Sequence, residues 1–218
     1  MNSLFSHYTV STFRGEDQTS AFADVKAGKF GMGFAYAGNF GLMNTNNKAA
    51  ASMSMPTVNA MYHITDMIAV AANVGFYSTN YKDKSGLNSA GNGTWDEFST
   101  TAWAVGLEVP LYLAKFNLLN FYVAPGGGYI PFKQTQTRTD IAGGVSTTRT
   151  GYPITSTSNY WSVYGVIGLQ VAINEQLQAF GRTTIGYASG TYNSGLQDST
   201  DSYFGLQSWS VGALFYFN

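Results

Sequence analysis

The stretch "KFGMGFAYAGNFGLM", Lys29 to Met43, separates large side chains from small ones by alternation. Successive side chains of an extended strand point to opposite faces, so this segment would have one bulky apolar face and one nearly bare face. Half-buried strands of soluble proteins usually alternate apolar with polar residues instead. The large set is Phe30, Met32, Phe34, Tyr36, Phe40 and Leu42, and the small set is Gly31, Gly33, Ala35, Ala37, Asn39 and Gly41.

Related alternation recurs along the chain and predicts eight strands in all. In the seventh of them, Gly181 and Thr183 interrupt the apolar parity. The seven further segments are Met55 to Ile64, Met67 to Tyr81, Thr101 to Leu113, Leu119 to Tyr129, Asn159 to Ile173, Leu177 to Tyr187 and Ser208 to Asn218.

The connections between these segments alternate in length. Short ones follow the second, fourth and sixth strands, at Thr65–Asp66, Ala114–Asn117 and Asn174–Gln176, and longer polar ones follow the others. Short turns at one end and long loops at the other are typical of outer-membrane barrels. Aromatic residues that could form girdles at the two membrane interfaces are Tyr36, Tyr62, Trp103, Tyr129, Trp161, Tyr187 and Trp209.

The composition agrees with a barrel in lipid. Charged residues make up 11% of the chain and aromatic residues 16%, whereas a soluble surface is about 25–35% charged. No window reaches 18 uncharged apolar residues, which excludes a transmembrane helix. The net charge of -1 gives no footprint for nucleic acid. The absence of cysteine excludes disulfides, thiolate metal sites and cysteine nucleophiles.

In strand number, loop asymmetry and the aromatic last strand "SWSVGALFYFN", the chain resembles the small eight-stranded outer-membrane barrels typified by OmpA and OmpX. The resemblance covers about residues 27–218. It implies an all-β, eight-stranded antiparallel transmembrane up-and-down β-barrel that is monomeric. Members commonly end in a Phe that serves as an assembly signal, whereas here Asn218 follows Phe217.

We expect residues 1–26 to form an amino-terminal extension, either a tail or a plug in the lumen. The opening "MNSLFSHYTV" lacks the basic and apolar regions of a signal peptide. The expected location is the outer membrane of a Gram-negative-type bacterium, with a signal peptide already removed.

The strand faces with large apolar residues are expected to point toward lipid. The faces with small residues are expected to point into the lumen of a narrow barrel, which side chains fill. Large residues such as Tyr77, Tyr122 and Tyr164 would occupy the space beside the first strand, or the segment before Ala27 would fold inward. A polar lumen network is predicted because buried polar groups need partners. An ion or solute path is the alternative role for these residues. The network comprises Asn59, Asn73, Glu108, Gln170, Gln178 and Arg182.

Other motifs give little sign of catalysis. His63 adjoins a predicted periplasmic turn and His7 precedes the barrel, so a Ser-His site at the outer rim is disfavoured. No cluster of metal ligands is apparent. "PGGGY", Pro125 to Tyr129, lacks the Lys-Ser/Thr of a phosphate loop and lies in a strand pattern, where it predicts a bend or bulge.

The Thr-rich segments "FKQTQTRT" and "TRTGYPITSTSN" predict a hairpin that projects from the barrel. This hairpin would be a solvated loop or an edge for strand addition to a partner.

The sequence thus predicts a barrel that is not an enzyme and needs no cofactor or metal. Its role would be structural, as an envelope anchor, or in adhesion or partner binding, and a narrow channel for small or apolar solutes is the alternative. A soluble lipocalin-type barrel is disfavoured by the girdles and the segregated loops. The expected partners are outer-membrane lipid and a protein bound at the extracellular loops or the amino-terminal segment, but not nucleic acid.

Overall fold

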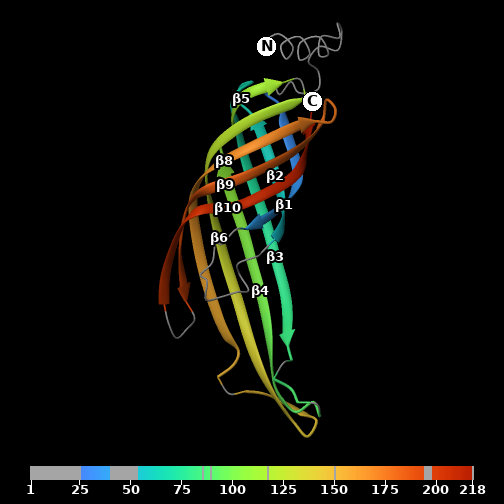
Figure 1. The fold of residues 1–218 in the computed structure, drawn as a ribbon, viewed down its shortest axis with the longest axis vertical. Coiled ribbons are helices and arrows are strands. Elements are labelled where there is room, and N and C mark those ends of the chain that lie inside the picture. The colour runs from blue at the N-terminus through green and yellow to red at the C-terminus, as the bar shows by residue number, and fades with distance from the viewer. Residues whose placement is uncertain are drawn as a thin grey trace, which may run out of the picture.

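A computed structural model describes residues 26–39, 54–84, 86–88, 90–116, 118–149, 151–193 and 198–217. Among these residues no helix is long and apolar enough to cross a membrane. The described chain is built from β-strands (Figure 1). They are β1 Phe30–Asn39, β2 Ser54–His63, β3 Ala69–Asp83, β4 Gly93–Glu108, β5 Leu111–Phe116, β6 Leu119–Ala142, β7 Val145–Thr148, β8 Ile154–Ala172, β9 Leu177–Asn193 and β10 Asp198–Phe217.

The strands close into one antiparallel ring. The order is β4-β3-β2-β1-β10-β9-β8-β6-β5, and β4 also pairs with β6. β4 and β5 share one position around the ring, since both pair with β6, and β7 and β8 likewise follow one another along β6. The ring therefore has the eight positions that the sequence predicts, and β1 closes it by pairing with β2 and β10.

A proline separates β4 from β5. Pro110 has no N–H to donate to the sheet, so a ladder is interrupted where it stands. The carbonyl of Pro110 nevertheless accepts a bond from the Ala69 amide (2.9 Å), and the Val109 amide donates to the carbonyl of Pro125 (3.0 Å). These two bonds continue the wall of the barrel across the interruption.

The two faces of the strands separate as the alternation predicts. Phe34 is 74% exposed on the outside of the ring, whereas its neighbour Ala35 is 7% exposed and points inward. The same contrast holds for Leu107 and Glu108 on β4. The strand faces with large apolar side chains therefore form the outer surface of the ring.

Aromatic side chains form a belt around this outer surface. Pairing places Phe76 opposite Trp103, and Tyr129 opposite Trp161. The ring centroids lie close together in three pairs: Phe76–Trp103 at 4.7 Å, Trp161–Tyr187 at 5.6 Å and Tyr36–Trp209 at 6.2 Å.

Several strands are longer than the sequence pattern predicts. β4 begins at Gly93 rather than Thr101, β6 runs for 24 residues to Ala142, and β10 begins at Asp198 rather than Ser208. Segments expected as loops are therefore strands. Thr and Ser pair well across strands, so polar segments can extend a sheet into water.

The extended parts of β3, β4, β6 and β8 form one continuous sheet beyond the barrel, the projecting sheet (Figure 1). Here β6 pairs with β4 as far as Ile141 and with β8 as far as Gln136. The segment "FKQTQTRT" has β4 on one side and, as far as Gln136, β8 on the other, so it offers no continuous free edge. For the second segment of the predicted hairpin, strand addition to a partner stays a prediction.

Polar side chains organise the short turns at the opposite end. Thr65 Oγ1 accepts bonds from the amides of Met67 (3.2 Å) and Ile68 (3.0 Å). Asn174 Oδ1 accepts bonds from the amides of Gln176 (2.9 Å) and Leu177 (2.8 Å). The turn predicted at Ala114–Asn117 is shorter than expected, since β5 continues to Phe116.

Some predictions fall outside the described residues. They include the amino-terminal extension with its plug, His7, and the end of the first strand beyond residue 39.

Candidate functional site

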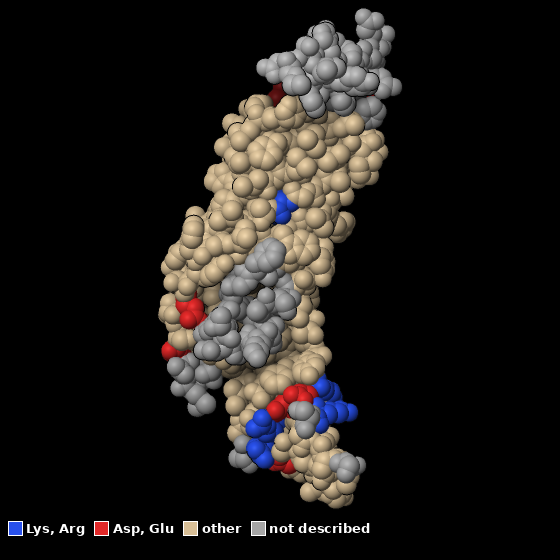
Figure 2. Space-filling model, in the orientation of Figure 1, with Lys and Arg blue, Asp and Glu red and all other residues tan. Residues whose placement is uncertain are grey.

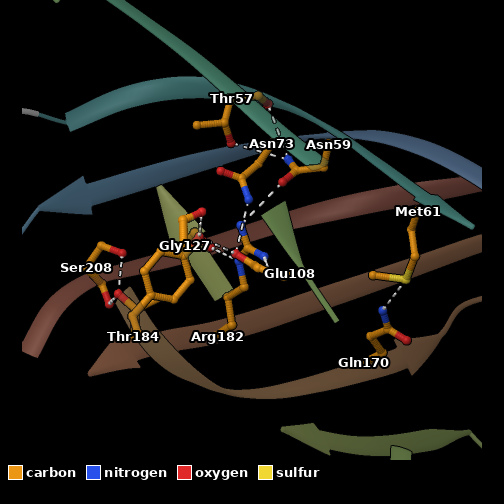
Figure 3. Close-up of polar contacts among 12 residues, drawn as sticks. Thr57, Asn59, Met61, Asn73, Glu108, Gly127, Gln170, Arg182, Thr184 and Ser208 are labelled. Atoms are coloured by element: carbon orange, nitrogen blue, oxygen red, sulfur yellow. Dashed lines mark hydrogen bonds and ion pairs between the residues drawn. The ribbon is translucent and has the colours of Figure 1, made fainter. Parts of the chain in front are cut away.

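An ion pair crosses the middle of the lumen (Figure 3). Arg182 on β9 donates from Nη1 to Oε2 of Glu108 on β4 at 2.5 Å. The side chain of Glu108 is 2% exposed and that of Arg182 is 11% exposed. Arg182 also donates from Nε to Ser210 Oγ (2.8 Å) and from Nη2 to Asn59 Oδ1 (3.4 Å).

The Glu108 carboxylate is surrounded by further donors. Asn73 Nδ2 donates to its Oε1 at 3.0 Å, and the Tyr164 hydroxyl donates to the same oxygen at 3.2 Å. The donors come from strands on several sides of the ring. A buried charge is tolerated when it is paired and hydrogen-bonded, and this carboxylate meets both conditions. We call Asn59, Asn73, Glu108, Tyr164, Arg182 and Ser210 the central layer.

Gln170 and Gln178 lie apart from these contacts, although the sequence predicts them in the same network. Gln170 accepts a bond from the Tyr112 hydroxyl at 3.0 Å and contacts the sulfur of Met61. Gln178 is 4% exposed, and its Oε1 has no hydrogen-bond partner among the described residues. Strands in a barrel tilt and are staggered, so residues of one parity lie at different heights. Parity alone therefore cannot show which of them meet.

A second layer fills the lumen near the short turns, and we call it the end layer. His63 is completely buried there, and its Nε2 lies 3.1 Å from the Tyr216 hydroxyl. The His63 ring also packs against that of Tyr112, with centroids 5.4 Å apart. The imidazole thus contacts tyrosines at the end of the barrel. The end layer comprises Met61, His63, Tyr112, Tyr122, Gln170 and Tyr216.

Tyrosine rings occupy the space that the glycines leave bare. A Cβ added to Gly31 would lie 2.9 Å from the Tyr216 ring, and one added to Gly168 would lie 2.1 Å from the Tyr122 ring. Tyr122 and Tyr164 reach into the lumen, but the glycines beside their rings lie on β8 and β6, and at Gly31 of the first strand the neighbouring ring is that of Tyr216. Tyr77 instead packs against Ala102 and Phe132 toward the projecting sheet. Sequence reasoning missed Tyr112 and Tyr216, whose signal was their place in the inward-facing alternation; Tyr216 lies opposite Gly31, and Tyr112 lies opposite Tyr122.

Two of the three glycines of "PGGGY" also make room for a tyrosine. A Cβ on Gly126 would lie 2.6 Å from the Tyr164 ring, and Gly128 has that ring at 3.5 Å. The register between β6 and β8 continues through Gly126, Gly127 and Gly128 without a shift. The expected bulge is therefore absent from this segment.

The charges of the projecting sheet are arranged in pairs. Arg138 forms two bonds to Asp96, from Nε at 2.8 Å and from Nη2 at 2.7 Å. Lys82 pairs with Glu97 at 3.4 Å on the other face. The hydrogen bonds from Arg138 lower the pKa of Asp96. Figure 2 shows the charged side chains gathered at this end, while most of the barrel surface in view is uncharged.

Among the described residues, two cavities larger than a single water molecule have polar side chains in their linings. One of about 80 Å³ lies beside the central layer and is lined in part by Arg182 and Glu108. The other, of about 470 Å³, lies on the inner face of the projecting sheet, and we call it the outer cavity. No group of three or more His, Asp or Glu side chains in the described ranges could hold a metal ion.

Comparisons with known proteins place the fold. The sequence matches no protein-family model and no curated protein. The structure is similar to OprG, an outer membrane protein of Pseudomonas aeruginosa, with a TM-score of 0.54 and 12% identity over 88% of this chain and 97% of that one. The chain thus has the fold of a small outer-membrane β-barrel, as the resemblance to OmpA and OmpX implies.

Two further solved structures are similar at lower scores. A major outer membrane protein from Thermus thermophilus has a TM-score of 0.47 and 15% identity over 87% of this chain and 99% of that one. Ail, the attachment invasion locus protein of Yersinia pestis, has a TM-score of 0.43 and 14% identity over 88% of this chain and 99% of that one.

Proposed function

We propose that this chain is a non-enzymatic outer-membrane β-barrel whose closed body holds the projecting sheet outside the cell for partner binding. One observation carries this proposal: β6 is 24 residues long. A tilted strand needs only about 9–11 residues to cross a membrane. More than half of β6 therefore lies outside the bilayer, and its neighbours extend with it.

The outer surface supports this placement in a membrane. Large apolar residues such as Phe34, Val105 and Leu169 are exposed on it, and water would not favour such a continuous surface. The aromatic belt matches the girdle at a membrane interface. The short turns then lie on the periplasmic side, and the projecting sheet extends from the opposite side.

The lumen supports a closed body rather than a wide pore. The end layer fills one level with tyrosines, and the central layer fills the next with an ion pair and its donors. Eight strands leave an interior that side chains can fill. In this reading the barrel anchors the projecting sheet, and the partner contacts the sheet.

Two measurements on the full chain test the proposal. Refolded protein in a planar lipid bilayer is expected to give no steady ion conductance. Bacteria that display the full chain are expected to adhere to mucin, to matrix protein or to one another better than bacteria displaying a variant whose β6–β8 hairpin is shortened by removing residues 135–155. Equal adhesion by the two strains, with equal surface amounts, would contradict the partner-binding role.

A narrow channel is the second candidate function. The cavity of about 80 Å³ beside Arg182 and Glu108 favours it, because a small void next to an ion pair could open if that pair exchanged partners. Steady conductance of the full chain, increased by Arg182→Met, would support the channel and contradict the closed body.

A further inference from the structure

The outer cavity has the size of a small-molecule site. Its volume is about 470 Å³ and its lining comes from β3, β4, β6, β8 and β9. Ligand sites usually measure about 300–1,000 Å³ and combine apolar walls with a few convergent polar groups. The lining has both components.

Aromatic rings form part of the wall. Tyr81 and Phe98 lie nearly parallel, with ring centroids 6.4 Å apart and an interplanar angle of 25°. Tyr77 packs against Phe132 at another part of the lining. Tyr81 is 60% exposed, so much of its surface is free to contact a ligand. These rings offer flat apolar surfaces.

Neutral polar side chains complete the lining. They are amides and hydroxyls, which donate and accept hydrogen bonds, and the Tyr192 hydroxyl donates to Ser156 Oγ at 3.1 Å. None of the described lining residues is charged. Arg138, farther out on β6, is engaged with Asp96. The neutral polar residues of the lining are Thr79, Thr100, Gln134, Gln136 and Ser156.

This chemistry selects among ligand classes. A charged ligand would lose water without finding an opposite charge in the lining. A purely apolar ligand would cover amides and hydroxyls and leave their hydrogen bonds unmade. A sugar ring has an apolar face of C–H groups for an aromatic ring and hydroxyls around its edge for amides and hydroxyls. A sugar ring can therefore pack against the aromatic part of the lining and hydrogen-bond with its polar part at the same time.

We infer that the outer cavity is a binding site for an uncharged saccharide of one or two sugar rings. The inference rests on the proposed function only in placing the projecting sheet outside the membrane, where dissolved or surface-linked sugars can reach it.

Binding is tested with the full chain in phospholipid nanodiscs, because glucoside and maltoside detergents carry sugar headgroups that would compete. Saturation-transfer NMR would use the methyl glycosides of glucose, galactose and N-acetylglucosamine, together with maltose. Glucose 6-phosphate, choline and 1-hexanol serve as anionic, cationic and apolar comparators. We expect at least one neutral sugar to bind more tightly than every comparator. A comparator that binds best, or no sugar binding at all, would overturn the inference.

Matched variants locate the site. Tyr81→Ala and Gln134→Ala should each weaken sugar binding by about five- to tenfold, since each removes a contact worth on the order of one hydrogen bond or one aromatic contact. Phe204→Ala alters an exposed residue and Thr135→Ala a half-buried one, both outside the lining, and each should change sugar binding less than twofold. Heat-modified gel mobility would confirm that each variant is folded. Equal losses in all four variants would place the sugar elsewhere.

The two proposals fail separately. Adhesion that persists without any sugar binding would remove the saccharide site and keep the partner-binding role. Sugar binding without adhesion would keep the saccharide site and remove the adhesion role.

Discussion

Strand β4 carries two carboxylates that meet arginines in two different settings. Glu108 lies in the barrel with its side chain 2% exposed, and it contacts Arg182, Asn73 and Tyr164. Asp96 lies in the projecting sheet with its side chain 20% exposed, and it forms two bonds with Arg138. The same pair of chemical groups thus occurs once in a dry lumen and once at a wet surface.

The contrast shows that surroundings decide what an ion pair contributes. If one partner is removed from a buried pair, the other charge remains without water or a counter-charge. If one partner is removed from an exposed pair, water replaces it, and the loss is small. Loss of one ion-pair partner should therefore destabilise the barrel more than the projecting sheet, although the same strands run through both.

The largest effect is expected from Arg182→Met in the barrel. Because Glu108 would stay buried without its cation, the free energy of unfolding should fall by about 3–5 kcal/mol. Arg138→Met in the projecting sheet should have a far smaller effect. Urea unfolding in lipid vesicles measures both. The cycle through Glu108→Gln and the double variant should show coupling, and strict additivity would contradict the pairing.

A second contrast concerns the outer surface at two depths on β4. Val105→Arg would place a charge inside the proposed apolar band and should destabilise the barrel by about 2–4 kcal/mol. Ser99→Arg changes the same face of the same strand beyond the belt, where the expected change is about 0–1 kcal/mol. Folding yield into vesicles and urea unfolding check this. Equal tolerance at both positions would place the apolar band elsewhere.

Packing inside the barrel gives the next effect. Gly168→Ala would put a Cβ at 2.1 Å from the Tyr122 ring, and such overpacking should lower the free energy of unfolding by about 1–3 kcal/mol. Gly181→Ala is the control, because its nearest atom would be Val211 Cγ1 at 4.0 Å. Thermal melting of both variants tests the assignment of Tyr122 as lumen filling. A stable Gly168→Ala protein would contradict it.

Acid should act on the projecting sheet through Asp96. Arg138 holds the pKa of this carboxyl below its ordinary value of 3.8. The pair therefore contributes its full stabilisation above that value and loses it as the pH falls through the lowered pKa. Carboxyl NMR titration should show Asp96 protonating below pH 3.8, and Arg138→Gln should move its pKa upward. An unchanged titration in the variant would show that Arg138 is not the cause.

The smallest effect is expected from deleting residues 2–20. The tyrosines of the end layer and central layer already fill much of the lumen, so the melting temperature and the conductance should stay as in the full chain. A lower melting temperature together with new ion conductance would instead assign a plug role to the amino-terminal segment.

Several features could be predicted from the sequence because they depend on neighbours along the chain. The alternation that begins at Lys29 predicted the side-chain directions seen in the described residues 30–38, since a strand has a period of two wherever it folds. The same rule predicted that Glu108 and Arg182 face the lumen. It did not predict the lengths of β4, β6 and β10, because Thr- and Ser-rich segments suit both loops and paired strands.

The sequence by itself determined the number of strand positions around the ring, their outer and inner faces, and the end at which the short turns lie. The tertiary structure alone decided which inward residues meet. Strand tilt and stagger bring Arg182 to Glu108, 74 positions away, and give Gln170 a different hydrogen-bond partner, Tyr112. It also decided that Tyr216 covers Gly31 and that Tyr81 and Phe98 line one cavity. These contacts depend on the register around the closed ring, and only the pairing of all the strands together fixes that register.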